Sequence, residues 1–133
     1  MKTTIKIIIV AFSLFVFTNL KSQTSFSCTY REYCLWNDYS KDYGKCEGYE
    51  ESSLFVMNNS ETMFTHTIES IKSTYYVNSR EYDSKNDVYT YDVTSDVGNK
   101  YFFIFDPKNK EVRAVYERKG ETILLRFYVK SIF

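Results

Sequence analysis

The chain has 133 residues, and its 17 basic and 17 acidic side chains give a formal net charge of zero. This length favours one small domain with a modest hydrophobic core. Because no basic patch is present, nucleic acid is not an expected partner, and neither is a polybasic attachment to a membrane surface. The thirteen Tyr and eleven Phe residues fit either the bias of AT-rich codons or a stacking surface for sugars or aromatic ligands.

The first 22 residues have the composition of a secretory signal peptide. Two lysines precede an apolar run over residues 7–17, an order that is typical of such leaders. The run is shorter than the roughly 20 apolar residues that a membrane-spanning helix needs. Small Ser22 suits the position before a cleavage point, so we expect cleavage before Gln23, a single domain over residues 23–133 and a periplasmic or secreted location.

The first part of the domain is expected to contain a strand over residues 26–36 and then a polar, Tyr-rich loop over residues 37–48. Trp36 and the tyrosines in or beside this loop form a candidate binding surface, because exposed Trp and Tyr side chains are over-represented at interfaces. The alternative is that these rings cover the open end of the barrel as a secondary core. The candidate binding residues are Trp36, Tyr39, Tyr43 and Tyr49.

Three cysteines lie in the same region, at Cys28, Cys34 and Cys46. An exported chain meets an oxidising compartment, where disulfides form. Six strand residues would separate Cys28 from Cys34 by roughly 20 Å, which is too far for a disulfide. A hairpin that turns near Ser40 would place Cys34 opposite Cys46, so we expect a Cys34–Cys46 disulfide. The remaining Cys28 is either a buried, inert thiol or a thiol available for intermolecular pairing.

From residue 53 onward, β-rich runs alternate with short polar turns, and no window shows the 3.6-residue apolar period of a helix. Short connections favour an antiparallel meander of about eight strands. An all-β sheet of this size is expected to bend strongly or to close into an up-and-down barrel. The expected strands cover residues 62–68, 73–82, 88–95, 101–105, 111–117 and 122–130.

Two of the turns share one layout, at residues 83–87 and 106–110. An Asp opens each turn, and Asn86 or Asn109 is expected to take the left-handed position of a type I turn with a bulge residue. Gly120 is expected to take the left-handed position of a further hairpin turn of this kind. These turns are explained by backbone geometry alone, so they are not candidate binding sites.

No arrangement of residues in the sequence indicates catalysis or a metal site. His66 is the only histidine, and a catalytic or zinc-binding role would need partners that are not evident. The acidic residues Asp83 and Asp87 do not fit a calcium loop, because Lys85 occupies a ligand position and Thr94 stands where the distal glutamate is needed. We therefore expect a non-catalytic protein without catalytic residues, metal ligands or cofactors.

The chain resembles small exported β-meander proteins found in Bacteroidota. The features that carry the resemblance are the leader ending at Ser22-Gln23, a Tyr-rich first strand at residues 29–33, the apolar strand at residues 54–57 and the Asp-containing hairpins that follow. The resemblance implies a fold and a compartment, because those proteins largely have no assigned function. Similarity to lipocalin-like barrels is limited to Trp36, since the tripeptide that ends there lacks the Gly of their Gly-x-Trp signature.

Two classes of function remain open. The domain could be a binding or interaction module, expected to be monomeric, that contacts an unknown protein or glycan partner through the aromatic surface around Trp36. It could instead be a lipocalin-like carrier that holds a small apolar ligand inside the barrel. Large inward-facing side chains such as Phe103, Phe105 and Phe127 would fill a small barrel, which favours the first class.

Overall fold

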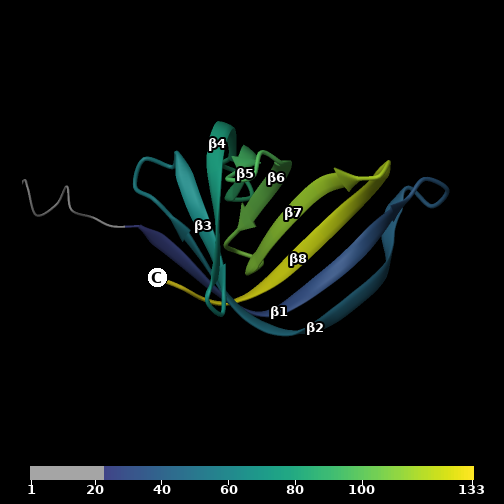
Figure 1. Cartoon of the computed structure of the whole chain (residues 1–133), viewed down its shortest axis with the longest axis horizontal. Coiled ribbons are helices and arrows are strands. Elements are labelled where there is room, and N and C mark those ends of the chain that lie inside the picture. The colour runs from purple at the N-terminus through teal and green to yellow at the C-terminus, as the bar shows by residue number, and fades with distance from the viewer. Residues whose placement is uncertain (1–22) are drawn as a thin grey trace, which may run out of the picture.

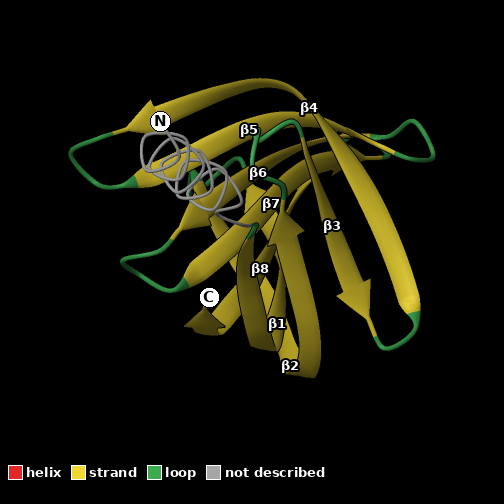
Figure 2. Cartoon of the chain, turned by 90° about the vertical axis from the view of Figure 1, so that its left-hand side faces the viewer, coloured by secondary structure: helices red, strands yellow, loops and turns green. Residues whose placement is uncertain are grey.

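The computed structural model describes residues 23–133, which form strands and turns without a helix (Figure 2). The all-β class expected from the sequence is confirmed, whereas the expected leader and cleavage point lie outside the described residues. Over the same range, the chain has no helix that is long and apolar enough to cross a membrane. The strands are β1 (Thr24–Asn37), β2 (Asp42–Met57), β3 (Met63–Ile68), β4 (Ile71–Asp83), β5 (Val88–Ser95), β6 (Lys100–Asp106), β7 (Glu111–Arg118) and β8 (Glu121–Ile132).

Consecutive strands pair antiparallel, and β8 pairs with β1, so the meander closes into a barrel (Figure 1). The ladder between β1 and β8 extends from Phe26 opposite Ile132 to Leu35 opposite Ile123. Closure gives the first and last strands a partner and removes the open edges that a flat sheet would leave. Of the two expected architectures, a strongly bent sheet and a barrel, the chain adopts the barrel.

The strand lengths give the barrel a tall side and a low side. β1 and β2 have 14 and 16 residues, whereas β3 has 6. The ladder between β2 and β3 ends at Ser53 opposite Ile68, so residues 42–52 of β2 pair only with β1. As a result, the β1–β2 hairpin projects beyond the rest of the barrel, at the right of Figure 1.

The polar segment at residues 37–48, expected to be a loop, is mostly strand. Only residues 38–41 form the turn, where the Asn37 side chain accepts hydrogen bonds from the amides two and three residues later, at 2.8 and 3.2 Å. Strand β2 continues through Gly48 without a break. At this position the ring of Tyr30 on β1 occupies the place where a Cβ atom would be. This glycine therefore permits close packing between neighbouring strands and does not mark a break.

The expected conformation of the Asp-containing turns is wrong by one residue. In the turn after Asp83, the left-handed residue is Asp87, with φ of 55°, and not Asn86. The Asn86 side chain instead donates a hydrogen bond to the Asp83 carboxylate at 2.8 Å. The next turn of this kind differs in the same way, with Lys110 in the left-handed conformation in place of Asn109. A four-residue loop closed by this side-chain bond replaces the shorter turn that the sequence suggested.

The interior of the barrel has two halves of different composition. Near the turns that join β4 to β5 and β6 to β7, apolar rings and aliphatic chains fill it. We call this the phenylalanine half, and its main members are Phe26, Phe55, Phe64, Phe105, Val112 and Phe127. Toward the opposite end, tyrosines dominate the inward-facing positions. We call this the tyrosine half, and its members are Arg31, Tyr33, Tyr49, Glu51, Tyr75, Tyr101 and Tyr116.

A β-bulge in β1 determines which of its side chains face the tyrosine half. The register of β1 shifts between Cys28 and Tyr30 against both β2 and β8. Because Cys28 faces the core, strict alternation would turn Tyr30 inward and Arg31 outward. The extra residue of the bulge reverses this order. Arg31 therefore lies opposite the buried core residue Phe127 and points into the barrel.

Candidate functional site

The barrel wall opens between β6 and β7 at the end of the tyrosine half. The ladder between these strands ends at Phe102 opposite Val115, although β7 stays paired with β8 as far as Arg118. A hollow of about 800 Å³ occupies this separation, a volume in the range of small-molecule sites. Its lining residues are Asp92, Asn99, Lys100, Tyr101, Phe102, Val115, Tyr116, Glu117, Arg118 and Thr122.

Tyrosine rings connect this opening with the interior. Tyr101 and Tyr116 face each other across the separated strands, with ring centroids 5.1 Å apart. The ring of Tyr75 lies 5.5 Å from that of Tyr101 and 5.1 Å from that of Phe64, which is fully buried. The opening is therefore bordered by rings that are continuous with the core, and their hydroxyl groups give it a polar lining.

Arg31 is the main charged group inside the tyrosine half. Its guanidinium lies 6.0 Å from the ring centroid of Tyr49 and 5.8 Å from that of Phe127, within reach of cation–π attraction. It also forms an ion pair with Glu51, with an N–O distance of 3.5 Å. The Arg31 side chain is 26% exposed and that of Glu51 is 16% exposed, so solvent reaches parts of both side chains, although Glu51 Oε1 itself is buried.

Two further polar side chains, Ser53 and His66, lie where the tyrosine half meets the phenylalanine half. The imidazole of His66 stacks on the ring of Phe55 at 4.0 Å and meets the edge of Phe127 at 4.9 Å. Burial, followed by the nearby Arg31 charge, lowers the pKa of His66 to about 4. The imidazole is therefore neutral at ordinary pH. It contributes hydrogen-bonding capacity to the site but no charge.

Three polar atoms at this junction are buried without a hydrogen-bond partner among the described residues. They are Glu51 Oε1, Ser53 Oγ and His66 Nε2. Buried polar atoms are normally paired, because leaving one unpaired costs free energy. All three belong to side chains that face the interior, as the pairing of Ser53 with Cys28 and of His66 with Phe55 indicates. The junction therefore has unused hydrogen-bonding capacity next to the tyrosine rings.

The same region affects the acidity of its tyrosines. Burial, with a smaller contribution from Tyr101 and Asp96, raises the pKa of Tyr75 to about 12. Burial and the neighbouring hydroxyls of Tyr33 and Tyr101 also raise the pKa of Tyr116. These phenols consequently stay protonated, so each can donate or accept a hydrogen bond without adding charge.

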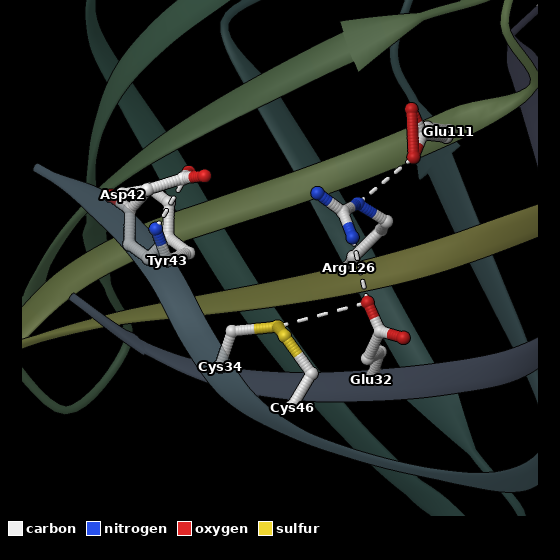
Figure 3. Close-up of a disulfide and its surroundings, with 7 residues drawn as sticks. All are labelled: Glu32, Cys34, Asp42, Tyr43, Cys46, Glu111 and Arg126. Atoms are coloured by element: carbon white, nitrogen blue, oxygen red, sulfur yellow. Dashed lines mark hydrogen bonds and ion pairs between the residues drawn. A yellow bond between two sulfur atoms is a disulfide. The ribbon is translucent and has the colours of Figure 1, made fainter. Parts of the chain in front are cut away.

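The Cys34–Cys46 disulfide joins the two strands of the projecting hairpin that carries part of the site (Figure 3). The Cα atoms of Cys34 and Cys46 lie 4.2 Å apart across β1 and β2, the pair chosen from the hairpin geometry expected above. Glu32 Oε1 lies 3.7 Å from the Cys34 sulfur and accepts a 2.6 Å hydrogen bond from Arg126. Arg126 Nε also lies 2.9 Å from a carboxylate oxygen of Glu111. Charged groups thus link β1, β8 and β7 on the outer surface.

This outer cluster is not a metal centre in the oxidised protein. Glu32 and the two sulfur atoms lie within 4.8 Å of one another. Both sulfur atoms, however, are used in the disulfide, and a metal would need thiolates. The remaining Cys28 is fully buried, and burial raises the pKa of its thiol to about 12. Its thiol therefore has little nucleophilic character.

The four aromatic residues expected to form one binding surface do not lie together. Trp36 and Tyr43 pair on the outer face of the β1–β2 hairpin, with ring centroids 5.0 Å apart. Tyr39 is fully exposed at the tip of the turn. Tyr49 lies opposite Arg31 and belongs to the tyrosine half. The expected surface is therefore a partly exposed pair on the outer face, a separate exposed ring at the turn and one ring of the tyrosine half.

The polar residues of the interior are not predicted by the sequence pattern. Arg31 was placed in a strand, but its inward direction depends on the bulge, which leaves no clear sequence signal. Glu51 is not among the candidate residues that the sequence indicates. His66 was examined as a catalytic residue, and its position beside the unpaired Ser53 could not be foreseen. The one available hint was the exceptional density of tyrosine in an otherwise small domain.

Comparison with known proteins identifies no relative. No protein-family model matches the chain, and neither a curated protein nor a solved structure is significantly similar to it.

Proposed function

We propose that this domain is an exported, non-catalytic binding protein that takes a small molecule into the tyrosine half of its barrel. The observation that carries the proposal is the hollow between β6 and β7, in which Tyr101 and Tyr116 are inward-facing rings while most other lining residues, such as Phe102 and Thr122, belong to the outer face. The hollow therefore leads from the outer surface toward the tyrosine half. A hollow of about 800 Å³ is large enough for a compact ligand. The disulfide supports export, because such bonds persist in oxidising compartments.

The two halves of the interior suggest where a ligand can lie. The phenylalanine half is closely packed by large rings, so it offers a floor but no room for a ligand. The tyrosine half combines partly exposed rings with unpaired polar atoms. The earlier alternative of a purely apolar ligand is therefore less favoured, since such a ligand would leave the Glu51 and His66 atoms without partners.

The test is to purify the exported protein and search it for a bound small molecule by native mass spectrometry. We expect an adduct that is lost when Thr122→Trp fills the hollow from its outer edge. Thr90→Trp is the matched control, because Thr90 also faces outward but does not line the hollow. If no adduct is found and a panel of small molecules leaves the melting temperature unchanged, the proposed function is wrong.

A second candidate function is supported by the exposed rings of the hairpin. Tyr39 is 100% exposed and Trp36 is 37% exposed. Together with Tyr43, they could contact a protein or a glycan, because Trp and Tyr commonly dominate such interfaces. Capture of a partner by the wild-type protein, but not by Trp36→Ala, would favour this function over an interior ligand.

A further inference from the structure

The charged groups of the tyrosine half balance one another. Arg31 and Glu51 lie 3.5 Å apart, and His66 beside them is neutral. Among residues 23–133, the other charged side chains at inward-facing positions near this end are Glu47, Arg118 and Glu121, which are exposed at its rim. Asp96 lies close enough to Tyr75 to affect its pKa, and the hollow itself is lined by two acidic and two basic side chains, Asp92, Glu117, Lys100 and Arg118. A ligand that reaches the interior therefore meets one positive and one negative group of similar accessibility.

The two members of the Arg31–Glu51 pair also do not satisfy each other's hydrogen-bonding groups. Their 3.5 Å distance exceeds the 2.7–2.9 Å that is usual for a hydrogen-bonded pair of opposite charge. Glu51 Oε1 accordingly lacks a hydrogen-bond donor. A ligand group that donates to Glu51 and accepts from Arg31 would complete both sets of interactions without removing either charge from its counterion.

We infer that the ligand of this site is an uncharged ring compound that carries a hydrogen-bond donor and an acceptor next to each other, an inference that rests on the proposed function. An anionic ligand would come close to Glu51, and a cationic one close to Arg31, where partial burial leaves repulsion poorly screened. An uncharged group avoids both costs. The ring of Tyr49 beside Arg31 and the rings of Tyr101 and Tyr116 at the hollow each offer a face on which a ring can stack.

Two kinds of compound have this chemistry: an aromatic ring with an amide group and a sugar ring with neighbouring hydroxyl groups. Glu51, Ser53 and His66 offer acceptor atoms, and Arg31 offers donors. Such a set can hold either compound by paired hydrogen bonds while the tyrosine rings contact its face. A probe of each kind distinguishes the two sources.

The experiment measures binding of four probes to the full, purified protein by isothermal titration calorimetry. Indole-3-acetamide, indole-3-acetate and tryptamine share one ring and differ in charge, and methyl β-glucopyranoside represents the sugar. We expect one of the two uncharged probes to bind, and to bind roughly tenfold more tightly than either charged probe. Binding of the acetamide alone identifies an aromatic amide as the ligand type, and binding of the glucoside alone identifies a sugar.

Substitutions that remove one charge should change the order of affinity in which the four probes bind. Glu51→Gln leaves Arg31 unbalanced, so the affinity for indole-3-acetate should rise roughly tenfold relative to the wild-type protein. Arg31→Gln should have the corresponding effect on tryptamine. Glu50→Gln is the matched control, because Glu50 is the neighbouring residue and lies opposite the outward-facing Tyr30, and this substitution should leave all four affinities unchanged.

The possible failures of the two proposals are distinguishable. If a charged probe binds to the wild-type protein as tightly as the uncharged probes, or if Glu51→Gln leaves the order unchanged, the inference is wrong and the proposed function stands. If no probe binds, the charge of the molecule found by mass spectrometry decides: an uncharged molecule supports the inference and a charged one overturns it. If no probe binds and no molecule is found, both proposals fail. If a variant does not fold, the relative affinities of the charged and uncharged probes for the wild-type protein still test the inference.

Discussion

The two halves of the barrel interior solve the problem of filling a small barrel in different ways. In the phenylalanine half, rings such as Phe55 and Phe64 are fully buried and contact one another edge to face or at a tilt. In the tyrosine half, rings of similar size are only partly buried, and they surround a charged pair. The first half is therefore packed as an ordinary core, whereas the second keeps exposed ring surface and unpaired polar atoms, as the proposed site requires.

The largest test of this difference is the removal of one ring from each half. Phe55→Ala should lower the free energy of unfolding by about 3–5 kcal/mol, because it removes a ring that contacts several others and leaves a cavity. Tyr101→Ala should cost roughly 1 kcal/mol, since its ring is partly exposed beside the hollow. Urea unfolding measures both values.

Equal losses for the two variants would show that the tyrosine half is an ordinary part of the core. Phe55→Leu serves as a milder substitution in case Phe55→Ala does not fold. It should still cost more than Tyr101→Ala, because the site at Phe55 is fully buried and closely packed.

The disulfide gives a second contrast, between the closed barrel and its projecting hairpin. Replacing both Cys34 and Cys46 by Ala should lower the free energy of unfolding by about 3 kcal/mol, because the bridge closes a short loop. The amides of residues 42–52 should also exchange faster with solvent, since this part of β2 has only β1 as a neighbour. Hydrogen exchange measured by mass spectrometry locates the change.

If exchange accelerates equally in β5 and β6, the hairpin is not a separate unit and the bridge stabilises the whole barrel. Peptide mapping without reduction is the accompanying control. Recovery of Cys28 in a disulfide with either partner would contradict the buried, free state of its thiol.

Strand bounds could be predicted from the sequence best where large and polar side chains alternate strictly. Val88–Ser95 was expected with the bounds that the structure has, because alternating large and polar side chains identify a strand with one buried face. Gly120 has the expected left-handed φ, 79°, but Lys119 beside it is left-handed too, at 51°. Local patterns therefore gave the strand and its approximate turn, and the exact turn depended on bonds made after folding.

The candidate site was less accessible to such analysis, for a physical reason. A single extra residue near Cys28 reverses the facing of every later side chain in β1 until the next irregularity. Without it, Arg31 would lie outside and no charged pair would exist in the barrel. The strand at residues 42–52 was hidden in a similar way, because its stability comes from pairing with β1 and from the disulfide, and its own sequence is polar and contains two glycines.

The boundary between the two halves, where the only histidine lies, should make the stability of the protein depend on pH. The pKa of His66 is lowered from 6.5 to about 4 in the folded protein. Between these values the unfolded chain binds a proton that the folded chain does not, so stability should fall as pH decreases from about 6.5 to about 4. The loss should approach 2–3 kcal/mol, on the order expected from a shift of this size.

Titration of the single imidazole signal by nuclear magnetic resonance checks the pKa directly. The control for stability is His66→Phe, which should remove this part of the pH dependence and keep the stacking on Phe55. An imidazole that titrates near 6.5 in the folded protein would mean that water enters the junction freely, and that the two halves are less distinct than the structure indicates.

The smallest effect is expected outside the barrel, at the exposed rings of the hairpin. Trp36→Ala should change the free energy of unfolding by less than about 1 kcal/mol, because the ring is partly exposed and its main contact is with Tyr43. It should also leave binding of the uncharged probe unchanged, since Trp36 faces away from the interior. Thermal melting and calorimetry on the same preparation measure both quantities.

A large loss of stability would mean that this ring is part of the core, and a loss of probe binding would mean that the outer hairpin and the interior form one site. If both stay unchanged while capture of a macromolecular partner is abolished, the molecule has two separate binding regions, one inside the barrel and one on its projecting hairpin.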